Sequence, residues 1–110
     1  MPTLRHNGID LYYETAGQGE ALLLLHGLGS RSEDWQLQAP AFAKRYRVVT
    51  ADMRGHGRTS KPPGPYSVPM MAADVLGLLD GLGMDAAHVV GLSMGGMIAF
   101  QMAVDRPERV

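Results

Sequence analysis

Short apolar runs alternate along the chain with segments of helical periodicity, and this alternation restricts the folds that the chain can adopt. Ala21–Leu25 is apolar at every position, as expected for a strand buried on both faces of a sheet. Two further runs, Arg47–Ala51 and Val89–Leu92, each follow a helix-like segment. Alternation of this kind predicts an α/β fold with three layers, in which helices cover both faces of a mostly parallel sheet of about five strands.

The first residues carry a signal for an antiparallel hairpin. Thr3–His6 and Ile9–Glu14 read as strands, and Asn7-Gly8 lies between them. Asn-Gly is favoured in two-residue hairpin loops because both residues tolerate a positive φ. We therefore expect the sheet to begin with an antiparallel pair.

The first helical segment follows a Gly-rich loop and contains a proline. Ser32 is placed to open a helix that runs to Phe42, and Pro40 is expected to break or kink it. Trp35 is interpreted as a packing residue, with a place in the wall of a substrate pocket as the alternative.

The second helical segment is expected to begin after Ser67, a favourable N-cap residue, and to stop at Gly83. Its apolar residues share one face at helical spacing and are Val68, Met71, Ala72, Val75, Leu78 and Leu82. Asp74 and Asp80 fall away from this face, so we expect solvent around both carboxylates.

Composition excludes several classes of function. The chain has 110 residues, enough for one small domain, with 45% hydrophobic and 19% charged residues. A formal net charge of -1 gives no electrostatic basis for binding nucleic acid or an anionic membrane. The run Ala21–Leu25 has five residues, too few to cross a bilayer, and no basic leader precedes it. Cysteine is absent, which fits a reducing compartment, and we expect a cytoplasmic protein.

The motif with the clearest chemistry is Gly91-Leu92-Ser93-Met94-Gly95, which fits the pattern G-x-S-x-G. An apolar run precedes it and a helical segment, Met94–Val104, follows it. A serine on such a sharp strand-to-helix turn stands clear of the sheet, and the glycines remove side chains that would clash with the turn. The helix N-terminus favours negative charge at the same place. The alternative is a strand–turn–helix packed with small residues that include a serine by chance.

Three motifs in order resemble the serine-nucleophile branch of the α/β-hydrolase superfamily. They are His26-Gly27-Leu28-Gly29, the segment 52–60 that begins with Asp52 and contains Arg54-Gly55-His56-Gly57, and the serine motif at 91–96. Within that superfamily the chain looks like the esterases, the enol-lactonases of the 3-oxoadipate type and the cofactor-free haloperoxidases. A serine at position 93 argues against haloalkane dehalogenases and epoxide hydrolases, which resemble this region but carry aspartate there.

The resemblance implies a role for each matching residue. Ser93 would be the nucleophile, and the backbone N–H groups of Leu28 and Met94 would form the oxyanion hole. His26 would orient its loop and take no proton. The surrounding turns would be supported by the glycines Gly27, Gly29, Gly91 and Gly95. No metal or organic cofactor is implied, and the four histidines of the chain show no metal-ligand spacing.

The resemblance also implies that part of the catalytic machinery is missing. The family order is nucleophile, acid and histidine, yet no histidine follows Ser93. The only carboxylates after it are Asp105 and Glu108, at the end of the last helix, and Glu108–Val110 have no predicted partner. Residues 1–110 are therefore expected to be the N-terminal part of an α/β-hydrolase core that ends after the nucleophile helix.

Two further expectations follow from this incompleteness. The strand before Ser93 would have one open edge, which the missing C-terminal half or a second copy in a homodimer would cover. His56, or alternatively His26, could act as a poor surrogate base for Ser93, with ordinary loop hydrogen bonding as the alternative.

The function expected on these grounds is hydrolysis of a small carboxylic ester or lactone through an acyl-enzyme on Ser93. The alternative is a non-catalytic remnant that self-associates or binds a partner. A cofactor-free perhydrolase would use the same residues.

Overall fold

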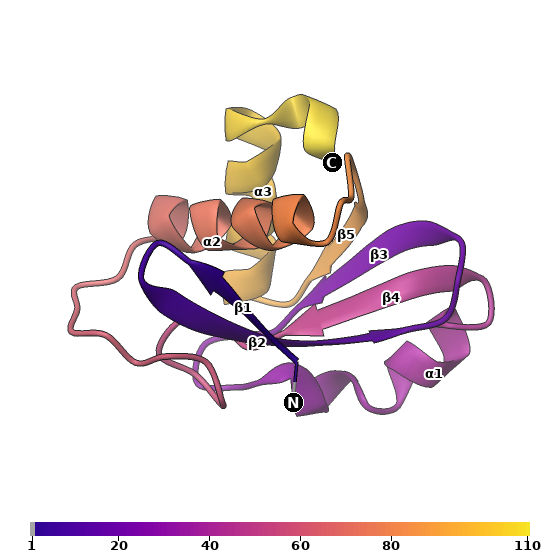
Figure 1. Cartoon of the computed structure of the whole chain (residues 1–110), viewed down its shortest axis with the longest axis horizontal. Coiled ribbons are helices and arrows are strands. Elements are labelled where there is room, and N and C mark those ends of the chain that lie inside the picture. The colour runs from indigo at the N-terminus through magenta and orange to yellow at the C-terminus, as the bar shows by residue number, and fades with distance from the viewer. Residues whose placement is uncertain (1) are drawn as a thin grey trace.

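Residues 2–110 are described by a computed structural model, in which helices cover both faces of a five-stranded sheet (Figure 1). The strands are β1 (Thr3–His6), β2 (Ile9–Ala16), β3 (Glu20–Leu25), β4 (Tyr46–Ala51) and β5 (His88–Gly91). The helices are α1 (Gln38–Phe42), α2 (Val68–Gly81) and α3 (Met94–Asp105), with 3₁₀ turns at Ser32–Trp35 and Pro107–Arg109.

The sheet has the order β1-β2-β4-β3-β5. β3 pairs in parallel with both β4 and β5, whereas β1–β2 and β2–β4 are antiparallel. The α/β fold class is confirmed, and the antiparallel part of the sheet is larger than the hairpin alone. β5 lies at an edge of the sheet formed by residues 2–110.

The predicted hairpin turn is present at Asn7-Gly8. Asn7 has a φ of 46° and Gly8 a φ of 82°, the left-handed conformation that this turn requires.

The strand β1 packs against α2 as well as pairing with β2. In the pairing, Leu4 of β1 lies opposite Leu11 of β2. Glycines of α2 let β1 pack against that helix, because a Cβ on Gly81 would lie 2.1 Å from the Leu4 side chain.

Alternate side chains of β3 pack into two separate apolar clusters, one on each face of the sheet. Leu23 and Leu25 are fully buried beneath α2 and α3, in a core that also contains Val75, Leu78, Ile98 and Met102. Leu22 and Leu24 face the other side, where Trp35, Ala39 and Phe42 pack on them. A strand covered on both faces must be apolar throughout, which explains the uninterrupted run that the sequence shows.

The break in the first helical segment lies earlier than predicted. Residues 32–35 form a 3₁₀ turn, and α1 starts at Gln38, so the interruption is at residues 36–37 and not at Pro40. Pro40 is the third residue of α1, within the first turn, where a backbone N–H has no helical acceptor to lose.

The prediction that Asp74 is solvated is wrong. Asp74 is 1% exposed, and both of its carboxylate oxygens accept hydrogen bonds from Arg54, at 2.6 Å from Nε and 2.7 Å from Nη2. This hydrogen bonding raises the pKa of the Arg54 guanidinium. Helical periodicity places Asp74 off the apolar face, but the loop that carries Arg54 covers that side of α2. Asp80 is exposed, as predicted.

The last residues also have partners that the sequence did not indicate. Arg109 is 8% exposed; its guanidinium donates to the carbonyl oxygen of Met84 at 2.8 Å and to that of Asp85. It also pairs with Asp80 at 2.8 Å. The turn at the end of the chain is thereby fixed against the loop that leads into β5.

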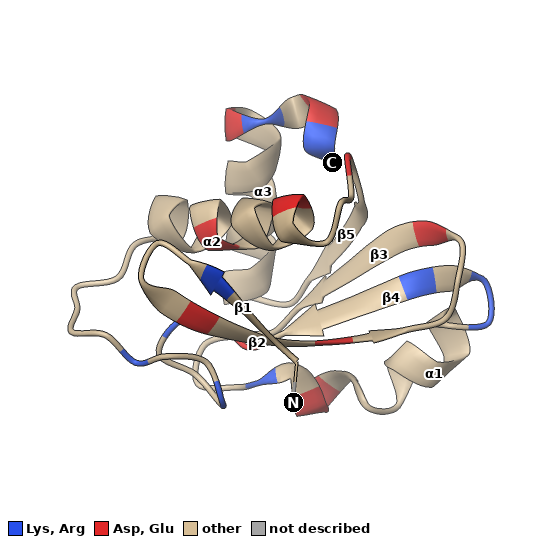
Figure 2. Cartoon of the chain, in the orientation of Figure 1, with Lys and Arg blue, Asp and Glu red and all other residues tan. Residues whose placement is uncertain are grey.

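Charged side chains are spread over the molecule, and α3 is uncharged until Asp105 (Figure 2). None of the helices in residues 2–110 combines the length and the apolar character needed to cross a membrane.

Replacing Asp74 by Ala is expected to lower the free energy of unfolding by about 3 kcal/mol, because it leaves the largely buried Arg54 guanidinium, whose side chain is 12% exposed, without its counter-ion. Urea unfolding followed by circular dichroism measures this change. Asp10→Ala is the control, because it removes a carboxylate whose ion pair with Arg5 is exposed on both sides and should contribute less than about 1 kcal/mol. Equal losses in the two variants would contradict the importance of the buried pair.

Candidate active site

Ser93 occupies a strained turn between β5 and α3. Its φ of 55° and ψ of -113° lie outside the regions that residues with a side chain normally adopt. Such a conformation costs on the order of 1–3 kcal/mol and persists only where the surrounding structure enforces it. The residue is exposed, as a nucleophile on such a turn must be.

Two glycines allow the turn to be this sharp. A Cβ on Gly91 would lie 2.3 Å from the carbonyl carbon of Gly95, and one on Gly95 would lie 2.2 Å from the carbonyl oxygen of Leu25. Both contacts involve backbone atoms, which cannot move aside cheaply. Gly96 has more room, since its nearest atom would be 3.5 Å away.

The loop after β3 lies directly against this turn. A Cβ on Gly27 would be 3.6 Å from the Cβ of Ser93, and the backbone N–H of Leu92 donates to the carbonyl oxygen of Leu25 at 3.1 Å. Within residues 2–110, neither the N–H of Leu28 nor that of Met94 donates a hydrogen bond. The loop that carries Leu28 thus lies beside the turn that carries Met94, and both amides are unpaired within residues 2–110; their role in an oxyanion hole stays a prediction.

His26 is fully buried and engaged at both ring nitrogens. Nδ1 lies 2.8 Å from the carbonyl oxygen of Gly27, and Nε2 accepts from the backbone N–H of Met53 at 2.9 Å. Since Nε2 is the acceptor, Nδ1 carries the proton and the ring is neutral. Burial, assisted by the neighbouring His56, lowers the pKa of His26. A ring held in this way can position its loop but cannot act as a base.

His56 is likewise engaged at both nitrogens. Its Nε2 accepts from the N–H of Gly29 at 3.0 Å, and Nδ1 donates to the carbonyl oxygen of Arg54 at 3.0 Å. Neither nitrogen is free to take a proton from Ser93. Both ring nitrogens thus take part in loop hydrogen bonding in this structure, and the surrogate-base role stays a prediction.

The Asp52 carboxylate holds two loops together, whereas the sequence indicated only that Asp52 begins a turn. Its carboxylate, which is 2% exposed, accepts from the backbone N–H of Ser32 at 2.7 Å and from that of Arg58 at 2.9 Å. Gly57 packs so closely that a Cβ there would lie 2.2 Å from the carboxylate. The signal in the sequence was an acid directly after a buried strand and before a Gly-rich loop.

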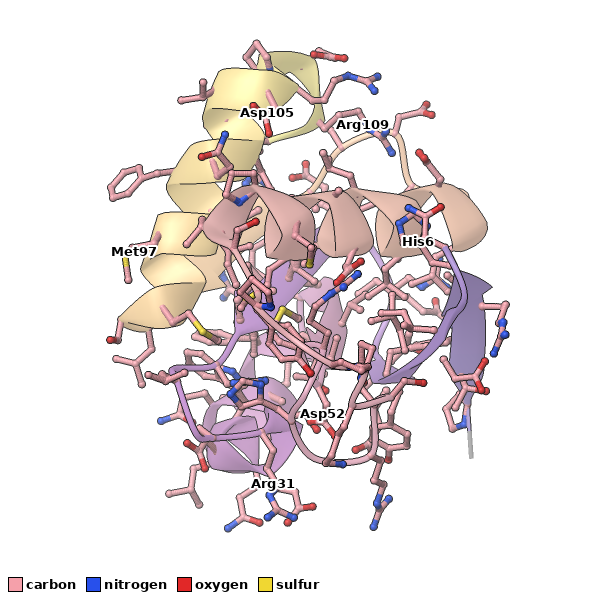
Figure 3. All side chains as sticks on the ribbon, turned by 90° about the vertical axis from the view of Figure 1, so that its left-hand side faces the viewer. His6, Arg31, Asp52, Met97, Asp105 and Arg109 are labelled. Carbon is pink, nitrogen blue, oxygen red and sulfur yellow. The ribbon has the colours of Figure 1, made fainter. Side chains whose placement is uncertain are left out.

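The surroundings of Ser93 are apolar and open. Leu28 is 77% exposed, Leu92 56% and Met97 54%, and Figure 3 shows Met97 pointing away from the body of the molecule. Trp35 is distant from this surface and lines a separate cavity of about 330 Å³ between β2, β4 and the segment 32–40.

Nothing in residues 2–110 completes a triad. No side chain in this part of the chain hydrogen-bonds the Ser93 hydroxyl. Asp105 lies at the opposite end of α3 (Figure 3), roughly 16 Å along the helix axis from Met94. Across the same residues, no group of three His, Asp or Glu side chains is placed to hold a metal ion.

Comparison with known proteins shows the family to which the chain belongs. The family profile of the alpha/beta hydrolase fold matches residues 20–110. The chain belongs to the α/β-hydrolase fold family. It is 39% identical over 109 residues to 3-oxoadipate enol-lactonase 2 of Acinetobacter baylyi, covering 97% of this chain and 41% of that protein.

Other relatives differ in their chemistry. A fluoroacetate dehalogenase from Burkholderia sp is 43% identical over 99 residues, covering 86% of this chain and 33% of that protein. The solved structure of Est816, an N-acyl homoserine lactone degrading enzyme, superposes with a TM-score of 0.96 at 40% identity, covering 99% of this chain and 42% of that one. The chain thus spans between 33% and 42% of the length of these three proteins.

Gly95→Ala is expected to lower the free energy of unfolding by about 3 kcal/mol or more, because the added methyl group overpacks the backbone of Leu25. Gly96→Ala is the matched control and should be neutral or stabilising by up to about 1 kcal/mol, since alanine favours the helix. Urea midpoints of the two variants give the comparison. Similar midpoints would show that the close approach at Gly95 does not constrain the turn.

Stability should fall as the pH is lowered through the ordinary imidazole range. Because the pKa of His26 is lowered on folding, below about pH 6.5 the unfolded chain binds a proton there that the folded chain does not. The contribution of neutral His26 to the free energy of unfolding is fully present above that pH. Below it, the free energy of unfolding falls by up to about 1.4 kcal/mol per pH unit. Between pH 5 and 8, the free energy of unfolding should depend more strongly on pH in the wild type than in His26→Asn. The exposed-histidine variant His88→Asn is the control; parallel curves for the wild type and His26→Asn would refute the assignment.

Proposed function

We propose that Ser93 is the nucleophile of a serine hydrolase that acts on a small carboxylic ester or lactone through an acyl-enzyme. The observation that carries the proposal is the position of this serine, strained and exposed at the start of α3 and beside the loop of Leu28, together with the backbone amides of Leu28 and Met94, which have no acceptor in residues 2–110. Strained residues of this kind cluster at catalytic sites, and unpaired amides aimed at one point bind developing negative charge.

The proposed reaction follows from these groups. The Ser93 oxygen attacks the carbonyl carbon of the substrate, and the serine proton passes to a base. The carbonyl oxygen becomes an oxyanion that accepts hydrogen bonds from the N–H groups of Leu28 and Met94, next to the positive end of α3. Collapse of this intermediate releases the alkoxide, which takes the proton from the base, and leaves an acyl group on Ser93. Water then attacks the acyl carbon and gives a proton to the same base. The bond from that carbon to the Ser93 oxygen breaks, and the base returns the proton to this oxygen as the acid leaves.

Ester or lactone chemistry is favoured over dehalogenation by the nucleophile itself. The chain is similar both to an enol-lactonase and to a fluoroacetate dehalogenase, so overall identity does not separate them. In the dehalogenases that this region resembles, the nucleophile position carries aspartate. A serine attacks an acyl carbon and forms an ester that water can hydrolyse.

The base and its acid partner must come from outside residues 2–110. β5 has a free edge beside α3, and Met97, Phe100 and Val104 form an exposed apolar stripe along that helix. We infer that the C-terminal part of a longer chain, or a second copy, covers this face. A cytoplasmic location stays a prediction.

A second candidate function is a non-catalytic module that self-associates or binds a partner. The observation that favours it is the same apolar stripe, together with a Ser93 hydroxyl that contacts no base in residues 2–110.

The decisive test fuses residues 1–110 to the part of the Acinetobacter enol-lactonase that follows its matching region, which restores the absent segment. The chimera should hydrolyse p-nitrophenyl acetate, and Ser93→Ala should reduce kcat/KM by about 10³-fold or more. Thr15→Ala, which removes an exposed hydroxyl of β2, is the control. The 110-residue chain alone is assayed beside them.

A folded chimera that hydrolyses no faster than its Ser93→Ala variant would favour the binding module. Ser93-dependent hydrolysis by the 110-residue chain alone would instead mean that a base within it, or across a dimer, serves the serine.

A further inference from the structure

We infer that His56 is a positioning residue for the oxyanion hole, holding the loop that presents the Leu28 amide to the substrate. The inference rests on the proposed function and assigns a role to the Arg-Gly-His-Gly motif, which that function does not use. It is argued from the two peptide groups on either side of Leu28.

The first of these peptide groups joins Gly27 to Leu28 and is held by His26. Its carbonyl oxygen, that of Gly27, accepts from Nδ1 of His26 at 2.8 Å and from the backbone N–H of Ser30 at 3.1 Å. In a trans peptide the C=O and the N–H point in opposite directions. With the oxygen turned toward the buried His26 ring, the N–H of Leu28 is turned away from it and keeps no acceptor in residues 2–110.

The second peptide group joins Leu28 to Gly29 and is held by His56. Its N–H, that of Gly29, donates to Nε2 of His56 at 3.0 Å. Gly29 has a φ of 78°, a conformation in which a side chain would be strained, so the loop turns back at this residue. Each peptide group next to Leu28 is therefore fixed by one histidine. The first carries the Leu28 N–H itself, and the second anchors the loop on the other side of Leu28, so loss of the His56 bond would free the loop that positions this amide.

The His56 ring is itself held from two sides. Nδ1 donates to the carbonyl oxygen of Arg54 at 3.0 Å, and the ring lies against that of His26 with centroids 5.0 Å apart. Arg54 is in turn anchored on α2 by its two hydrogen bonds to Asp74. The oxyanion loop, whose Leu28 side chain is 77% exposed, is thus connected through His56 to the buried core.

Three substitutions separate the functions of the ring. Gln reaches about as far as Nε2 and can still accept from Gly29. Asn reaches only the Nδ1 position and keeps the bond to Arg54. Phe keeps the contact with His26 but accepts nothing. If His56 acts through Gly29, His56→Gln should resemble the wild type, while His56→Asn and His56→Phe should fail alike.

The first measurement is amide hydrogen exchange of the 110-residue chain, resolved by NMR. The Gly29 amide should exchange at least tenfold faster in His56→Phe and His56→Asn than in the wild type and His56→Gln, with the amides of β3 and α2 unchanged. Equal Gly29 exchange in all four proteins would overturn the inference, whether or not the chain is an enzyme.

The second measurement uses the chimera described above, with p-nitrophenyl acetate as substrate. His56→Phe should lower kcat at least tenfold with KM within threefold of the wild type, and His56→Gln should restore kcat to within threefold. An unchanged kcat in His56→Phe would overturn the inference. An inactive wild-type chimera would count against the proposed function alone, since the exchange data would still decide whether His56 holds the loop.

Discussion

The close approach between the end of β3 and the start of α3 is the constraint on which the site depends. The position that a Cβ of Gly95 would take is 2.2 Å from the Leu25 carbonyl oxygen, so the helix begins almost in contact with the strand. This proximity turns the chain within one residue and forces Ser93 into its strained conformation. The cost is offset by the parallel pairing of β3 with β5 and by the burial of Ile98 and Met102 under the sheet. Strain at Ser93 is therefore a property of the packed core and not of the turn alone.

Around this turn, side chains stabilise loops through bonds to the backbone. Parallel strands end at the same edge of a sheet, so the loops after β3, β4 and β5 meet there. His26 and His56 bond to the loop after β3, and Asp52 joins the segment that begins at Ser32 to the loop after β4. Each of these polar groups has its partners, and Asp52 and His26 are nearly or fully buried. A satisfied polar network of this kind rigidifies a loop region that would otherwise be mobile.

Periodicity and turn chemistry predicted the elements, because both are local properties. The Asn7-Gly8 turn, the cap at Ser67 and the two-sided burial of β3 are all visible in short stretches of sequence. What could not be predicted depends on residues far apart in the chain. The burial of Asp74 requires Arg54 from a distant loop, and the helix period alone assigns that aspartate to solvent. The role of His56 depends in the same way on Gly29, 27 residues earlier. The motifs in the sequence predicted that the loops at residues 26–29 and 52–60 are neighbours. Only the fold shows that the Gly29 N–H and the His56 Nε2 atom form a hydrogen bond.

The arrangement also determines from which side a base can reach Ser93. The loops 26–29 and 52–60 occupy the side of the turn toward β3 and β4, and their histidines are committed to backbone groups. The other edge of β5 is unpaired in residues 2–110, and α3, which packs against β5, carries the exposed apolar stripe. The strained conformation of Ser93 and the positions of the Leu28 and Met94 amides proposed for the oxyanion hole depend on contacts made within residues 2–110. A base needs only to place one nitrogen near the serine oxygen, so it can be delivered by a more distant segment. We propose that such a segment approaches from the open edge of β5; by covering that edge it would complete the sheet and the site together.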